Sequence, residues 1–138
     1  MKPYDYIIGI DPGTHTGIAL YSSKTKELEL YTMKIHEAMK MVAFQHDMNS
    51  NIVVRFEDAR LRTWFGTAGR EQLQGAGSIK RDCTIWEDYL TDCKIKFEKV
   101  APRNNKTKLA AEQVKQLTGY SLRCSGHARD AGMLVYGF

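Results

Sequence analysis

The sequence has few cysteines and prolines and no long apolar run. Three cysteines and three prolines occur in 138 residues, and the cysteines at positions 83, 93 and 124 form no C-x-x-C pair. An odd number of widely spaced cysteines argues against a disulfide framework or a zinc finger and indicates reduced thiols. No stretch approaches the roughly 20 apolar residues that span a bilayer. Residues 1–6 are polar and show no signal peptide, so we expect a cytoplasmic protein with no membrane contact.

The composition is that of an ordinary folded domain. Hydrophobic residues make up 43% and charged residues 26% of the chain, without repeats or low-complexity tracts. This length predicts a single domain over residues 1–138. The net charge of +4 and the pI of about 9.0 favour a polyanionic partner without establishing one.

The order of apolar patterns predicts an α/β fold. Strands are expected at residues 5–11, 16–22, 27–33, 51–57 and 93–102, and helices at 35–48, 70–92, 106–118 and 125–136, with a loop at 58–69. Short connections make the first three strands an antiparallel meander, and the later alternation predicts a mixed five-stranded sheet with helices on both faces. This β-β-β-α-β-α-β-α order resembles the ribonuclease H-like fold.

Four polar residues mark the ends of central elements. Asp11 ends the first strand directly before Pro-Gly, Glu57 ends the fourth strand, and His127 and Asp130 lie three residues apart on the last helix. Positions i and i+3 share one helix face. If the first and fourth strands are neighbours, all four side chains meet, and they form a ligand set suited to Mg²⁺ or Mn²⁺.

Each of these residues also has a purely structural explanation. Asp11 is a common turn residue before Pro-Gly, Glu57 is a solvated strand end, and Asp130 near a helix N-terminus is favoured by the helix dipole. Asp58 is an alternative to Glu57, because strand alternation sends the two side chains to opposite faces. The combination in this chain order, more than any single residue, favours a common site.

Five segments together resemble a known family. They are "IGIDPGTHTGIAL", "VVRFEDA", "LQGAGSIKRDCTIWEDYL", "KFEKVAPRNNKTKLAAEQVKQLTG" and "HARDAGMLV". In this order they resemble successive motifs of the RuvC-type Holliday junction resolvases, and they cover most of the chain. The chain is shorter than many such resolvases, which suggests a compact version encoded by a phage or a mobile element.

The resemblance implies a metal-dependent endodeoxyribonuclease that resolves four-way DNA junctions by paired symmetric nicks. It implies two Mg²⁺ (or Mn²⁺) ions per active site, with Asp11, Glu57, His127 and Asp130 as catalytic residues and metal ligands. A junction with two-fold symmetry needs two coordinated cuts, which a homodimer supplies. The helix over residues 73–90 is the expected dimer interface, with Trp86 as its anchor.

The resemblance also implies contacts to DNA from two segments, and the aromatic pair at Trp64 and Phe65, which lies later in the chain than the family's aromatic residue, offers a third. The expected DNA-binding residues are Gly77, Ser78, Lys80, Arg81, Arg103, Lys106, Lys108, Trp64 and Phe65. Clustered lysines and arginines would supply the salt-dependent part of affinity, and an exposed aromatic pair could stack on unpaired bases. The alternatives are solvated helix faces for the cations and core packing for the aromatic pair.

Other functions remain open at this point. "DPGTHTG" also resembles the first phosphate loop of actin-like ATPases and sugar kinases, although those proteins need two such domains around a cleft. A broader branched-DNA or flap nuclease of the same fold would share the metal chemistry. A non-catalytic DNA-binding protein of this fold would have no need of the intact set of four polar residues.

Overall fold

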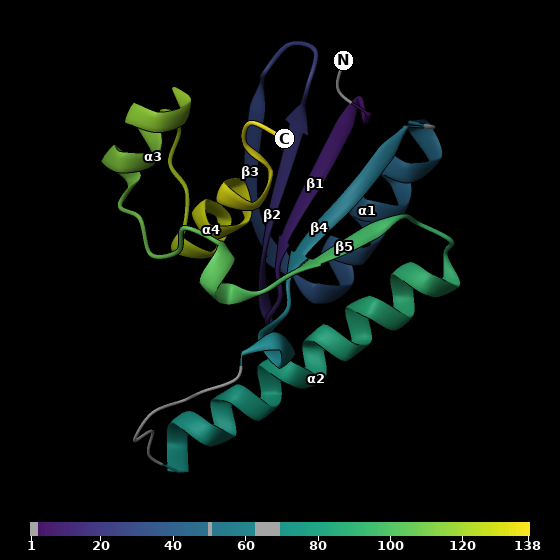
Figure 1. The fold of residues 1–138 in the computed structure, drawn as a ribbon, viewed down its shortest axis with the longest axis vertical. Coiled ribbons are helices and arrows are strands. Elements are labelled where there is room, and N and C mark those ends of the chain that lie inside the picture. Colours follow the sequence, from purple (N-terminus) through teal and green to yellow (C-terminus); the bar gives the residue numbers. More distant parts are fainter. Residues whose placement is uncertain (1–2, 50, 63–69) are drawn as a thin grey trace.

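The five strands form one sheet, which lies between two layers of helices (Figure 1). The computed structural model describes residues 3–49, 51–62 and 70–138, with the side chains of the second helix described from Gly77 onward. Trp64 and Phe65 lie outside the described residues. The elements in chain order are β1 (Tyr6–Asp11), β2 (His15–Ser22), β3 (Leu28–Lys34), α1 (Ile35–Met48), β4 (Ile52–Glu57), η1 (Ala59–Leu61), α2 (Arg70–Asp92), β5 (Phe97–Val100), η2 (Pro102–Asn104), α3 (Ala111–Thr118) and α4 (Gly126–Val135).

The sheet is mixed, as the sequence predicts. Its strand order is β3-β2-β1-β4-β5. Short turns join β1, β2 and β3 into an antiparallel meander, whereas β4 runs parallel to both β1 and β5. The expected adjacency of the first and fourth strands is therefore confirmed, and the chain belongs to the general α/β class.

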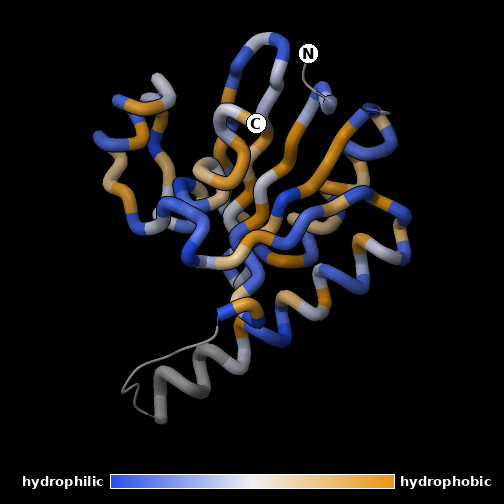
Figure 2. Tube along the Cα trace, in the orientation of Figure 1, coloured by the Kyte–Doolittle hydropathy of each residue, from blue (hydrophilic) through white to orange (hydrophobic). Residues whose placement is uncertain are grey.

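Strand alternation divides the core between the two faces of the sheet. Ile8 and Ile10 of β1 point to one face, where they pack with Trp86 of α2 and Val42 of α1. Ile7 points to the other face and packs with the apolar residues of α3 and α4. Figure 2 shows apolar residues concentrated on the central strands. Because β4 is covered on both faces, its first three residues are all apolar and buried, and Phe56 is buried after Arg55.

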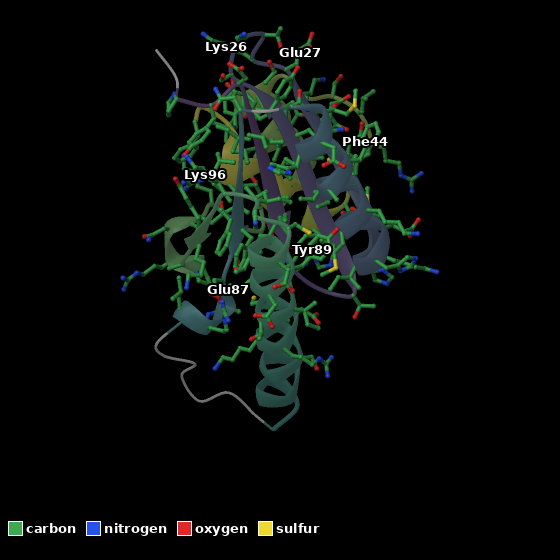
Figure 3. All side chains as sticks on the ribbon, turned by 90° about the vertical axis from the view of Figure 1, so that its right-hand side faces the viewer. Lys26, Glu27, Phe44, Glu87, Tyr89 and Lys96 are labelled. Carbon is green, nitrogen blue, oxygen red and sulfur yellow. The ribbon has the colours of Figure 1, made fainter. Side chains whose placement is uncertain are left out.

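The carboxyl-terminal half of α2 is fixed to the rest of the fold by side-chain contacts. Tyr89 donates a hydrogen bond of 3.1 Å to the backbone carbonyl of Met39 in α1. Glu87 pairs with Arg60 at 2.9 Å and with Lys99 at 3.2 Å. Figure 3 shows Glu87 and Tyr89 on opposite sides of the helix. The first turns of α2 extend beyond the edge of the sheet at which β4 ends (Figure 1).

The expected role of Trp86 as a dimer anchor is wrong. Its side chain is 0% exposed and lies in the core beneath the sheet. The apolar stripe of α2 at Cys83, Trp86 and Leu90 therefore covers the protein's own sheet. Ile79 and Ile85 are the large apolar side chains of the described part of α2 that remain exposed, at 42% and 41%.

Two elements are shorter than the sequence predicts. The strand expected at 93–102 comprises only Phe97–Val100. A turn after α2 takes up the first residues of the expected strand. In this turn Lys94 has a φ of 56°, and the amide of Ile95 donates a hydrogen bond to the carbonyl of Leu90. The helix expected at 106–118 begins at Ala111. Gly119 ends this helix with a φ of 80°, as a glycine after a helix predicts.

Within the part of the chain that the structure describes, none of the helices has both the length and the apolar character needed to cross a membrane.

Candidate functional site

The parallel pairing of β1 and β4 places two carboxylates at one edge of the sheet. Ile7 is paired with Val53 and Gly9 with Arg55, so continuation of this register brings Asp11 beside Glu57. Side chains alternate along a strand, and Arg55 contacts α4 through a 2.8 Å hydrogen bond from Nε to the carbonyl of Leu134. Asp11 and Glu57 therefore both face the side of the sheet that α4 covers.

Helix α4 begins directly over this edge. Ser125 caps the helix by accepting a 3.1 Å hydrogen bond from the amide of Ala128, as a serine before a helix predicts. Ala128, Ala131, Leu134 and Val135 are buried against the sheet. His127 and Asp130 lie in the first turns of α4, at the end that reaches the two strand carboxylates.

Two glycines allow α4 to lie very close to the sheet. A Cβ atom on Gly9 would lie 2.3 Å from the carbonyl oxygen of Ala131, and one on Gly17 would lie 2.0 Å from that of His127. These distances are far inside van der Waals contact, so the helix backbone occupies the space that any other residue would fill. The position of His127 relative to Asp11 therefore depends on the absence of a side chain at Gly17.

Asp11 and His127 form a direct pair. Nδ1 of His127 lies 3.1 Å from Oδ2 of Asp11, which is within hydrogen-bond distance. Burial raises the pKa of Asp11 to about 6, with the charges of Glu57 and Asp130 acting in the same direction and the hydrogen bond from His127 opposing them. The three carboxylates are thus close enough to repel one another.

A second group of contacts joins Glu57 to Asp130 through the loop after β5. Nδ2 of Asn105 donates to Oε2 of Glu57 at 2.9 Å and to the backbone carbonyl of Asp130 at 3.1 Å. The amide of Lys108, a residue with a φ of 59°, donates to Oδ1 of Asp130 at 2.9 Å. Burial raises the pKa of Glu57, Asp130 raises it further, and the Asn105 hydrogen bond and the charge of Arg62 offset part of this shift.

The structure separates the roles of Glu57 and Asp58. The side chain of Asp58 is 1% exposed, and its two oxygens accept from Nε and NH2 of Arg60 at 2.8 Å each. Burial raises the pKa of Asp58, but hydrogen bonds from Arg60 outweigh that effect and the net shift is downward. Asp58 therefore caps and anchors η1, whereas Glu57 lies with Asp130 at the site.

A cleft of about 380 Å³ opens beside Glu57 and Asp130. Three cationic side chains line it together with these two carboxylates: Arg62, Arg103 and Lys108. Arg103 and Lys108 are among the cations predicted from the sequence, and Lys106 lies exposed on the same loop. The cleft thus combines positive charge, which attracts anions, with the carboxylates at its side.

Sequence reasoning missed Arg62 and Asn105. Arg62 follows η1 in an irregular segment without a motif, and Asn105 reaches Glu57 across 48 residues of sequence. The only sequence signal for this loop is its Pro-Arg-Asn-Asn-Lys composition, which predicts a turn but not which side chain points inward.

The predicted contacts on α2 come from the face of the sheet opposite to α4, where Cys83 of the same helix lies 3.7 Å from the backbone carbonyl of Glu57. Gly77, Ser78 and Arg81 are exposed, and Lys80 is half-buried. A Cβ atom on Gly77 would meet nothing within 4 Å, so this glycine is not required by packing among the described residues.

The chemistry of the site fits a divalent cation, although no finished ligand set is present. Among the described residues, no group of three or more His, Cys, Asp or Glu side chains is already arranged to hold an ion. The side chains instead form two adjoining groups, one around Asp11 and one around Glu57. Mutually repelling carboxylates with raised pKa values favour a bound positive charge, and carboxylate and amide oxygens are the donors that Mg²⁺ and Mn²⁺ prefer.

The chain was compared with known proteins by sequence. No family model matches it, and no curated protein matches it either.

Proposed function

We propose that this protein is a metal-dependent, structure-selective DNA endonuclease that resolves four-way junctions, with a ribonuclease H-like fold and similarity to the RuvC-type resolvases. The observation that carries the proposal is the convergence of Asp11, Glu57, His127 and Asp130 at one edge of the sheet, where their contacts and charges are coupled. These residues come from three separate elements. Their convergence is the arrangement that the resemblance in sequence requires.

The topology supports the fold part of the proposal. A meander of three antiparallel strands, with β4 and then β5 added in parallel beside β1, is the arrangement expected of a ribonuclease H-like sheet. Helices from the later part of the chain cover both faces. The carboxylates lie at the carboxyl ends of two neighbouring parallel strands, where ligands bind in sheets of this kind.

In the proposed reaction, a phosphodiester bond of DNA is hydrolysed to leave a 5′ phosphate and a 3′ hydroxyl. Divalent cations, when bound, supply an activated water and stabilise the charge that develops on the phosphate and the leaving oxygen. Asp11, Glu57 and Asp130 provide the negative oxygens that hold these cations. His127, whose Nδ1 lies 3.1 Å from Oδ2 of Asp11, would hold this carboxylate in place beside the cations.

The cations of the cleft give the substrate its position. Arg62, Arg103 and Lys108 line the space next to Glu57 and Asp130, where they can contact phosphate oxygens on either side of the scissile bond. Such contacts fix the register of the backbone and carry no base sequence. A preference for branched DNA would then come from the shape of a second binding surface, for which exposed residues of α2 are our proposal.

Two coordinated cuts require two copies of the site, so we propose a homodimer acting in the cytoplasm of a bacterium or a phage-infected host. Because Trp86 is buried in its own subunit, an interface on α2 would have to use residues such as Ile79 and Ile85. A monomer with full activity on junctions, measured by sedimentation alongside cleavage, would exclude the dimer.

The proposal is tested by cleavage of end-labelled four-way junction, flap and linear duplex DNA in Mg²⁺, Mn²⁺ or EDTA. We expect paired symmetric nicks in the junction that need the metal and disappear in Asp11→Asn. The variant should bind DNA as tightly as the native protein or more tightly, because it loses a negative charge near phosphate.

Other outcomes of the same assay would change the assignment. Cutting of flaps or of all DNAs would indicate a broader nuclease that uses the same site. Tight junction binding without cutting, under all metal conditions, would favour a non-catalytic DNA-binding protein. Normal cutting by Asp11→Asn would show that the metal assignment is wrong. Tight ATP binding without cutting would favour the phosphate-loop alternative.

A further inference from the structure

Asn105 occupies a central place in the site that no motif predicts. Its Nδ2 group donates two hydrogen bonds, one of 2.9 Å to the Glu57 carboxylate and one of 3.1 Å to the backbone carbonyl of Asp130 in α4. One amide therefore ties the end of β4 to the first turns of α4. These two elements carry carboxylates that repel each other, and the raised pKa of Glu57 reflects this repulsion in part.

The other end of the same amide lacks a partner. Oδ1 of Asn105 is buried and accepts no hydrogen bond from the described residues. The two acceptors around Nδ2 fix which end of the amide is the nitrogen, so rotation of the amide would replace two good hydrogen bonds with two repulsive contacts. A buried amide oxygen without a donor costs roughly 1–3 kcal/mol, a cost that the two hydrogen bonds made by Nδ2 must offset for Asn105 to keep this position.

The surrounding backbone holds Asn105 in place. Its amide donates to the carbonyl of Pro102 at 3.1 Å, which closes η2. Three residues further on, the amide of Lys108 donates to Oδ1 of Asp130 from a left-handed backbone conformation. Such a conformation is uncommon for lysine and costs about 1–3 kcal/mol. Two separate contacts thus hold the loop against the carboxylates: Nδ2 of Asn105 donates to Glu57, and the amide of Lys108 donates to Asp130.

We propose that Asn105 is a positioning residue for cation binding: its amide sets the spacing of Glu57 and Asp130, the two carboxylates beside the cleft that would hold the cation. This inference rests on the proposed metal dependence. Partners that orient metal ligands in this way typically change metal affinity 10- to 100-fold when they are removed.

The test compares Asn105→Ala and Asn105→Ser with Asn104→Ala. Asn104 is the adjacent, exposed asparagine of the same loop, so it controls for the loss of an amide without the loss of these contacts. Binding of Mn²⁺ alone is measured by the loss of its free electron paramagnetic resonance signal. Junction cleavage is measured as a function of Mn²⁺ concentration, and thermal unfolding shows that each variant is folded.

We expect both Asn105 variants to bind Mn²⁺ about 10 to 100 times more weakly than the native protein, and Asn104→Ala to match it. The half-saturating Mn²⁺ concentration for cleavage should rise by the same factor, while the rate at saturating Mn²⁺ recovers to within about threefold of the native rate. The serine variant tests the proposal even if the alanine variant does not fold.

Different results would contradict the role of Asn105 and the proposed metal-dependent function. Unchanged Mn²⁺ affinity in folded Asn105 variants would overturn the role of Asn105 and leave the nuclease assignment intact. A lower melting temperature without a change in Mn²⁺ affinity would likewise reduce Asn105 to a structural residue. Absence of Mn²⁺ binding by the native protein would overturn the metal-dependent function and this inference with it.

Discussion

Replacing Gly17 with alanine should displace α4 from the sheet. The added Cβ atom would lie 2.0 Å from the carbonyl oxygen of His127 and 2.9 Å from the amide nitrogen of Ala128. Both are backbone atoms, which cannot move out of the way by a side-chain rotation. To reach an ordinary contact of 3.4 Å, the start of α4 must move by about 1.4 Å. That shift would break the 3.1 Å contact between His127 and Asp11.

Two effects of Gly17→Ala can be measured separately. Overpacking of this kind costs about 1–3 kcal/mol, which lowers the melting temperature by about 3 °C for each kcal/mol in a domain of this size. Misplacement of reacting groups by about 1 Å can reduce a rate about 100-fold, so junction cleavage should fall by about that factor at temperatures where the variant is folded.

The matched control for stability is Gly77→Ala. Among the described residues, a Cβ atom at Gly77 would meet nothing within 4 Å, and Gly77 lies within α2. Alanine should therefore stabilise the protein by about 0.5–1 kcal/mol through its higher helix propensity. If calorimetry shows that Gly17→Ala is as stable as the native protein, the close approach of α4 to β2 is not a feature of the folded molecule and the argument for the site geometry fails.

Three further predictions concern electrostatics, thiol reactivity and DNA affinity. Hydrogen bonds from Arg60, and secondly from Lys99, lower the pKa of Glu87. Ionised Glu87 therefore stabilises the folded state at pH values above its unfolded pKa of about 4.3. This stabilisation is lost as the pH falls through the lower pKa of the folded state. Glu87→Gln should therefore lower the free energy of unfolding by up to about 1 kcal/mol at neutral pH and by progressively less in acid. Urea denaturation at several pH values measures this difference. A difference that does not change with pH would contradict the pairing. Burial raises the pKa of Cys83 to about 11, so mass spectrometry should find Cys83 alkylated more slowly than the two less buried cysteines in the folded protein, and equal rates would contradict its burial. Arg103→Ala and Lys106→Ala should each weaken junction binding without changing base preference. Each should also reduce the slope of log affinity against log salt concentration by about one per lost phosphate contact. Unchanged slopes, measured by fluorescence anisotropy, would exclude those contacts.

Local patterns predicted the elements that depend on a few neighbouring residues. The bounds of α1 and α2 follow from apolar spacing, and the cap at Ser125 and the end of α3 at Gly119 follow from helix-terminus chemistry. The strand ends at Asp11 and Glu57 follow from apolar runs that stop at an acidic residue. These features are determined by interactions within one or two turns or strands.

Features that depend on distant contacts were not predictable in the same way. The stripe at Trp86 shows that α2 has an apolar face, but not that this face covers the protein's own sheet. Strand alternation alone does not distinguish Asp58 from Glu57, because only the pairing of Asp58 with Arg60 shows where its side chain points. The role of Asn105 depends on a partner 48 residues away in sequence, and the irregular start of α3 depends on a left-handed backbone at Lys108.

The contact between Asp11 and His127 joins residues 116 positions apart in the chain. A ribosome adds about 5–20 residues per second, so at least about six seconds separate the synthesis of these two halves of the pair. The meander of β1, β2 and β3 can form early, but the edge that carries the acidic groups stays without α4 until that helix has been synthesised. A nascent chain that lacks α4 therefore carries an incomplete group of side chains, and the order of synthesis delays the assembly of this edge.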